Sequence, residues 1–137
     1  MLVYGAIIPH PPFVLERVGK EHAAQLTATR AAMESVGEDL LSLHVDTVVL
    51  ITAHGERYKE ALGIAFHDPY EADLKAFGDM GTIVEAQPDM LFIDRLQRVM
   101  RKDGLRATMT TNDTLDHGAA IPLTVFEPYM QNMKIVV

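Results

Sequence analysis

Residues 2–12 read LVYGAIIPHPP, and residues 47–56 read TVVLITAHGE. In each stretch a strand-forming apolar run is followed closely by a histidine, His10 in the first and His54 in the second. A helix-period stretch separates the two runs, and the order strand, helix, strand predicts two parallel strands joined by a right-handed crossover. Both histidines are then expected at the carboxyl-terminal edge of one sheet, where open α/β proteins bind their ligands.

The rest of the chain continues an α/β pattern. The first strand, residues 3–8, is almost entirely apolar, as expected where helices cover both faces of a mostly parallel sheet. The spacing of apolar residues predicts helices over residues 19–43 and 88–102, and strands over residues 47–53, 61–66, 105–110 and 134–137. Residues 72–83 give no clear pattern, residues 111–113 read as a polar loop, and residues 117–130 mix loop with short helix. We expect one domain over residues 1–137.

Composition excludes several classes of partner. The net charge is −7 and no long run of Lys or Arg is present, so nucleic acid and anionic membranes are not expected partners. The apolar runs are too short for a signal peptide or a membrane span, and a cytoplasmic location is the expectation. There are no cysteines, so a bound metal must be held by imidazole and oxygen ligands. Such ligands suit iron(II), manganese or zinc.

His10 and His54 are the predicted metal ligands. Two imidazoles and one carboxylate make a facial site that leaves positions open for dioxygen and a catechol. Opening a catecholic ring also needs a base for the phenolic proton, and imidazole suits that task because its charge changes near neutral pH. His117 is the candidate catalytic residue, and the adjacent Asp116 is a candidate orienting or charge-stabilising neighbour.

A purely structural interpretation competes for each residue taken singly. A histidine in a proline-rich turn, as at His10, is more often a turn or capping residue than a ligand, and Asp116–Gly118 also suits a turn. The expected joint position of His10 and His54 favours a metal site. Glu56 lies two residues after His54 and is a possible secondary site residue, although a solvated loop carboxylate is the favoured interpretation.

Three blocks of the sequence resemble the class III extradiol dioxygenase (LigB-like) family. They are residues 5–12 (GAIIPHPP), residues 52–56 (TAHGE) and residues 115–123 (LDHGAAIPL), in the family's order. The first block looks most like the branch related to MEMO and AMMECR-type proteins. The resemblance implies a mostly parallel α/β domain that binds non-haem iron(II), with His10 and His54 as metal ligands and His117 as the acid/base residue beside the substrate.

This chain differs from the family in its length and in its set of metal ligands. Family members are longer, and their remaining metal ligand follows the equivalent of Val137. Either Glu56 or Asp116 replaces it, or the chain is the N-terminal part of a longer domain; we favour the second, because the sequence stops inside an apolar strand pattern. An incomplete site would bind metal weakly, and the chain would then be inactive.

Three functions remain as hypotheses. The first is an iron(II)-dependent dioxygenase that cleaves a catecholic ring next to its hydroxyls. The second is a zinc-dependent hydrolase at the same site, and the third is a non-catalytic, MEMO-like binding domain. An unfinished sheet edge favours association into a homo-oligomer.

Overall fold

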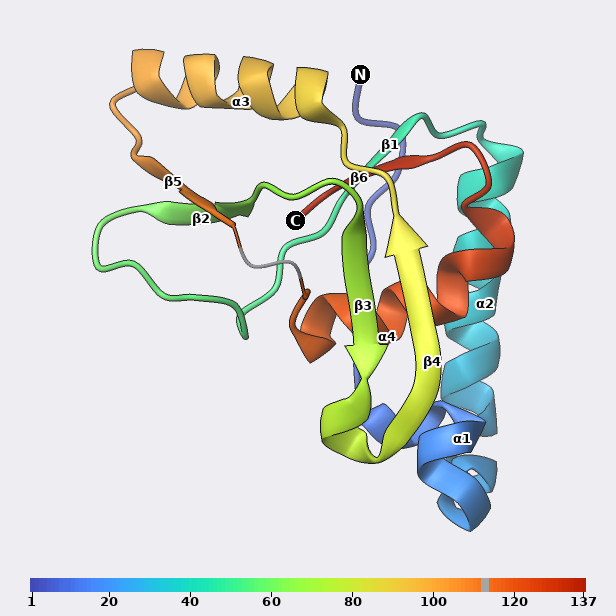
Figure 1. Ribbon diagram of the computed structural model, residues 1–137. Helices are drawn as coiled ribbons and strands as arrows, with labels where there is room; N and C mark the ends of the chain where they lie inside the picture. Colours follow the sequence, from blue (N-terminus) through green and yellow to red (C-terminus); the bar gives the residue numbers. More distant parts are fainter. Residues whose placement is uncertain (112–113) are drawn as a thin grey trace.

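The computed structural model of the protein describes residues 1–111 and 114–137 (Figure 1). Residues 112 and 113 of the predicted polar loop therefore lie outside the described residues. The helices and strands, with 3-10 helices marked η, follow in chain order: η1 (Pro12–Val14), α1 (Glu16–Gly19), η2 (Lys20–Leu26), α2 (Thr27–Ser42), β1 (Thr47–Val49), β2 (Leu62–Ala65), β3 (Tyr70–Leu74), η3 (Lys75–Phe77), β4 (Asp79–Ala86), α3 (Met90–Lys102), β5 (Ala107–Thr110), α4 (His117–Phe126), η4 (Glu127–Tyr129) and β6 (Lys134–Val136).

The described residues form two parallel strand pairs. β1 pairs with β6 in parallel, and β2 pairs with β5 in parallel. A backbone hydrogen bond from Ala65 N to Val137 O (2.8 Å) connects the end of β2 with the residue that follows β6. The predicted α/β class with parallel strands is thus confirmed, and the strands predicted near residues 61–66, 105–110 and 134–137 are present in shorter form.

Helices lie on both sides of β6. Ile135 and Val136 are neighbours on β6 and point to opposite faces, as side chains alternate along a strand. Ile135 belongs to the larger core cluster, to which α4 contributes more residues than any other element. Val136 packs with Ile93 and Met100 of α3. Figure 1 shows α3 on one side of β6 and the α2–α4 pair on the other. Among the described residues, no helix has the length and apolar character that a bilayer crossing requires.

The prediction of a strand over residues 3–8 was wrong. Residues 1–11 lie in neither helix nor strand, and the side chains of Leu2 and Ile7 are 90% and 101% exposed. A strand is stabilised by hydrogen bonds to a neighbouring strand and by burial of at least one face. Among the described residues, residues 3–8 pair with no strand, and Ile8 packs only in part against the core. β1 is likewise shorter than predicted, because regular pairing with β6 ends at Val49, although Leu50 N still donates to Val136 O.

The long helix predicted over residues 19–43 is divided in two. Lys20 has a positive φ of 48°, and the 3-10 helix η2 precedes the α-helix α2, which begins at Thr27. Gly37 of α2 is a close-packing position: a Cβ there would collide with the ring of Tyr129 in η4.

An antiparallel hairpin occupies residues 70–86 and includes residues 72–83, for which no element was predicted. Tyr70, Ala72 and Leu74 of β3 are buried, while the residues between them are only partly buried, as in a strand with one face on the core. The turn closes through η3 and Gly78, whose φ of 85° suits glycine. Not all strand pairs are therefore parallel, and this hairpin packs against α4 (Figure 1).

Candidate metal centre

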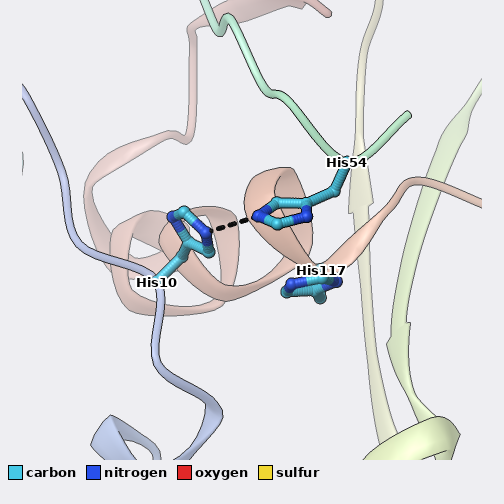
Figure 2. A group of neighbouring side chains, drawn as sticks. All are labelled: His10, His54 and His117. Carbon is cyan, nitrogen blue, oxygen red and sulfur yellow. Dashed lines mark hydrogen bonds between the residues drawn. The ribbon is translucent and has the colours of Figure 1, made fainter. Parts of the chain in front are cut away.

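Three histidines from distant parts of the sequence meet at one place. His10 lies on the extended N-terminal segment before η1, His54 on the loop that follows β1, and His117 at the first position of α4 (Figure 2). The local sequence explains each position. Prolines on both sides of His10 prevent regular structure there, and Asp116 at the N-cap starts α4 at His117.

The distances among these side chains are short. The Nε2 atoms of His10 and His54 lie 2.8 Å apart, and their rings meet edge to face at an angle of 72°. The ring of His117 lies beside both, with its centroid 4.1 Å from that of His54 and 5.7 Å from that of His10. One ligand atom from each histidine can be chosen so that all three lie within 4.8 Å of one another. His54 is exposed and the other two are half-buried, so the cluster is open to small molecules.

The donor set fits a divalent metal ion. Two imidazole nitrogens bound to one ion at about 2.1 Å, in positions at right angles, lie about 3.0 Å apart. The observed Nε2 separation of 2.8 Å is close to that value. Imidazole nitrogen is a ligand for iron, zinc and other transition metals, so the chemistry agrees with the geometry.

Asp116 connects the start of α4 to the loop that carries His54. Its Oδ1 accepts hydrogen bonds from Gly118 N (2.7 Å), which caps the helix, and from the hydroxyl of Thr52 (2.8 Å). The backbone N–H of His54 in turn donates to Thr52 Oγ1 (3.2 Å). The sequence suggested an orienting role for Asp116 next to His117. It did not single out Thr52, although a residue two positions before His54 lies on the same face of an extended segment.

Gly118 allows the His54 loop to lie directly against α4. A Cβ at this position would collide with Thr52 Oγ1 and would lie only 3.1 Å from Cδ2 of the His54 ring. Contacts this short force a shift of the neighbouring atoms. The glycine in the Asp-His-Gly sequence is therefore required by the close approach of His54, a reason that the sequence alone did not reveal.

Phe77 covers one side of the cluster. Its ring meets that of His117 nearly edge to face, at a centroid distance of 5.6 Å and an angle of 72°. Phe77 belongs to η3, at the tip of the β3–β4 hairpin, so the hairpin brings an apolar aromatic wall to the histidines. Sequence reasoning did not include Phe77 in the site, because its contact depends on a hairpin that it did not predict.

The two carboxylates proposed as secondary site residues differ in position. Asp116 lies beside the cluster, with one oxygen engaged by Thr52 and Gly118. Glu56 is exposed and accepts a hydrogen bond from the hydroxyl of Tyr58, which raises the pKa of that tyrosine. Among the described residues, the group of potential metal ligands contains the three histidines and neither carboxylate.

The chain resembles known proteins along nearly its whole length. The family model described as the catalytic LigB subunit of aromatic ring-opening dioxygenase matches residues 4–137, a range that includes all three histidines. The chain is also similar to Protein CA_C1420 of Clostridium acetobutylicum, with 24% identity over 139 residues. That match covers 95% of this chain and 30% of the relative, so the chain spans about a third of the length of the curated protein it matches.

Proposed function

Since the chain belongs to the family of the catalytic LigB subunit of aromatic ring-opening dioxygenases, we propose that it forms one domain of a non-haem iron(II) enzyme that cleaves a catecholic ring next to its hydroxyls. The observation that carries the proposal is the convergence of His10, His54 and His117. The family relationship supports metal-dependent chemistry on an aromatic ring. The choice of iron(II) and of a catechol is the proposal's own.

His10 and His54 are the residues proposed to hold the ion, through the Nε2 atoms that face each other. Iron(II), when bound, would supply a Lewis acid and a source of electrons that brings the catechol and dioxygen together. The edge-to-face packing of the two rings limits their rotation, and a fixed imidazole loses little freedom on binding a ligand.

His117 is proposed as the acid/base residue. Its ring lies against that of His54 and farther from that of His10, so it stands beside the pair that would hold the ion. From this position a ring nitrogen of His117 can accept the phenolic proton of a catechol and return it to the product. Phe77 shields one side of the ring from water and offers a surface for an aromatic substrate.

Oxygen uptake with catechol as substrate tests this assignment in the iron-loaded protein. His117→Ala is expected to keep its iron and to lose turnover by about 10²–10⁴-fold, as for the loss of a general acid or base. His22→Ala, at an exposed histidine outside the cluster, is the matched control and is expected to react as the unaltered protein does. Uptake that is unchanged in His117→Ala would remove the proposed role of this residue.

A zinc-dependent hydrolase is the second candidate, and the presence of three imidazoles favours it. Three histidine ligands with an open fourth position are a known donor set of catalytic zinc, which would supply an activated water. In that case metal analysis of protein purified without oxygen would find zinc rather than iron. Esterase activity without oxygen uptake would then decide for the hydrolase and against the dioxygenase.

A further inference from the structure

Two threonines in the sequence TVVLITAHGE each donate a hydrogen bond to an aspartate that caps a helix. Thr47 donates to Oδ2 of Asp89 (2.6 Å), and Asp89 accepts from Phe92 N to cap α3. Thr52 donates to Oδ1 of Asp116 (2.8 Å), and Asp116 accepts from Gly118 N to cap α4. The two bonds have the same chemistry, but only the second lies next to the histidine cluster.

The Thr52 hydroxyl differs from that of Thr47 because it also accepts a bond from His54. Through the N–H of His54 (3.2 Å) and Oδ1 of Asp116 (2.8 Å), it connects the backbone of one histidine with the helix end that carries another. A hydroxyl can donate and accept at the same time, and a methyl group of similar size can do neither. The connection therefore depends on the oxygen and not on the volume of the side chain.

The space around this connection is tightly packed. Gly118 leaves no room for a Cβ between the Thr52 hydroxyl and the His54 ring. Without the hydroxyl, the hydrogen bond between the loop and the helix is lost, and Oδ1 of Asp116 accepts only from Gly118 N. The His54 loop then has fewer restraints on its distance from α4.

We propose that Thr52 is a positioning residue that sets the spacing of His54 and His117, and through it the metal affinity of the site. The inference rests on one part of the proposed function, which is that the histidines hold a metal ion. It does not depend on which reaction follows. Residues that support a ligand from behind commonly change metal affinity by about 10–100-fold when they are replaced.

Cobalt(II) titration tests this proposal, because visible absorption reports both the affinity and the ligand geometry. Thr52→Val is expected to weaken cobalt binding by about 10–100-fold and to change the spectrum. Thr52→Ser, which keeps the hydroxyl, is expected to stay within a few-fold of the unaltered protein. Thr47→Val is the matched control: it removes the equivalent bond to Asp89 and is expected to leave cobalt binding unchanged.

Several outcomes would overturn the proposal. They are a Thr52→Val variant that binds cobalt as tightly as the unaltered protein, an equal loss in Thr47→Val, and an equal loss in Thr52→Ser. If Thr52→Val does not fold by circular dichroism, Thr52→Ala replaces it with the same expected loss. A Thr52 effect on cobalt binding, together with oxygen uptake that His117→Ala leaves unchanged, would uphold this inference while contradicting the proposed catalytic role of His117.

Discussion

The Nε2 atoms of His10 and His54 lie 2.8 Å apart, although 44 positions separate the two residues in the chain. Neither histidine is held by a strand. His10 lies on an extended segment between prolines and His54 on the loop after β1, while packing against α4 brings the two loops together. The candidate metal centre thus lies at the amino-terminal end of α4, and two of its three histidines are on loops.

The first prediction concerns the contact between Gly118 and His54. Gly118→Ala is expected to lower the free energy of unfolding by about 1–3 kcal/mol, because the added methyl group overpacks the space between Thr52 and the His54 ring. It is also expected to weaken metal binding. Urea denaturation and cobalt titration measure the two effects.

Gly81→Ala is the control for this prediction. Its Cβ would meet the end of the flexible Arg17 side chain at 3.4 Å and Oδ1 of Asp79 at 3.8 Å, an ordinary van der Waals distance. Its effect on stability is expected to be small and its effect on metal binding absent. Equal losses in the two glycine variants would show that the close approach of His54 to α4 is not the cause.

The second prediction concerns the contact between Gly37 of α2 and Tyr129. Alanine is a better helix former than glycine by about 1 kcal/mol, yet Gly37→Ala is expected to destabilise the protein because its Cβ would collide with the Tyr129 ring. In a Tyr129→Ala background the same substitution is expected to be neutral or stabilising. Urea denaturation of the four proteins gives the interaction energy, and additive effects would contradict the contact.

The third prediction concerns stability in acid. The Thr82 hydroxyl and the N–H of Gly81 donate to Asp79 and hold the pKa of that carboxyl below its ordinary value of 3.8. The unfolded chain therefore takes up the proton at a higher pH than the folded protein does. The stabilisation by Asp79 is complete above pH 3.8 and is lost as the pH falls through the lower pKa of the folded state.

Unfolding free energies measured between neutral pH and pH 2 test the role of Asp79. Asp79→Asn is expected to be less stable than the unaltered protein at neutral pH and to lose less stability on acidification. Asp46→Asn, at an exposed carboxylate, is the control and is expected to follow the unaltered protein. An acid profile that Asp79→Asn leaves unchanged would contradict the assignment.

Hydrophobic periodicity predicted α3, the part of the long helix that α2 forms, and the strands β1, β2, β5 and β6, because these elements bury one stripe or one face in a regular pattern. It did not resolve α4, which was expected only as a mixture of loop and short helix. The pattern of α3 and the Asp89 that caps it could both be recognised in the sequence. Residues 3–8 show the limit of this reasoning. An apolar run states a preference for the strand conformation, but a strand also needs a partner, and residues 3–8 have none among the described residues.

The hairpin carried a signal that sequence reasoning did not use. Buried Tyr70, Ala72 and Leu74 alternate with Glu71 and Asp73, which is the period of a strand with one face on the core. The acidic residues and the glycines near the turn hid this pattern.

The meeting of His10 and His54 was predicted, but by a route that the structure follows only in part. The sequence placed both residues just past the ends of strands. His54 does lie on the loop that follows β1, whereas residues 3–8 form no strand and His10 lies on an extended segment. Thr52, Gly118 and Phe77 contribute to the site through tertiary contacts. Sequence reasoning predicted none of these contacts, although the two-residue spacing of Thr52 from His54 indicated a shared face.

Metal binding by the paired imidazoles tests the central claim most directly. We predict that calorimetric titration with iron(II) under anaerobic conditions finds one bound ion. His10→Ala and His54→Ala are each expected to weaken iron binding by more than roughly 100-fold, the largest effect expected when only a supporting residue is lost. His22→Ala is expected to bind as the unaltered protein does. If His10→Ala and His54→Ala retain the full iron affinity, the two facing Nε2 atoms do not form a metal site and the account is contradicted.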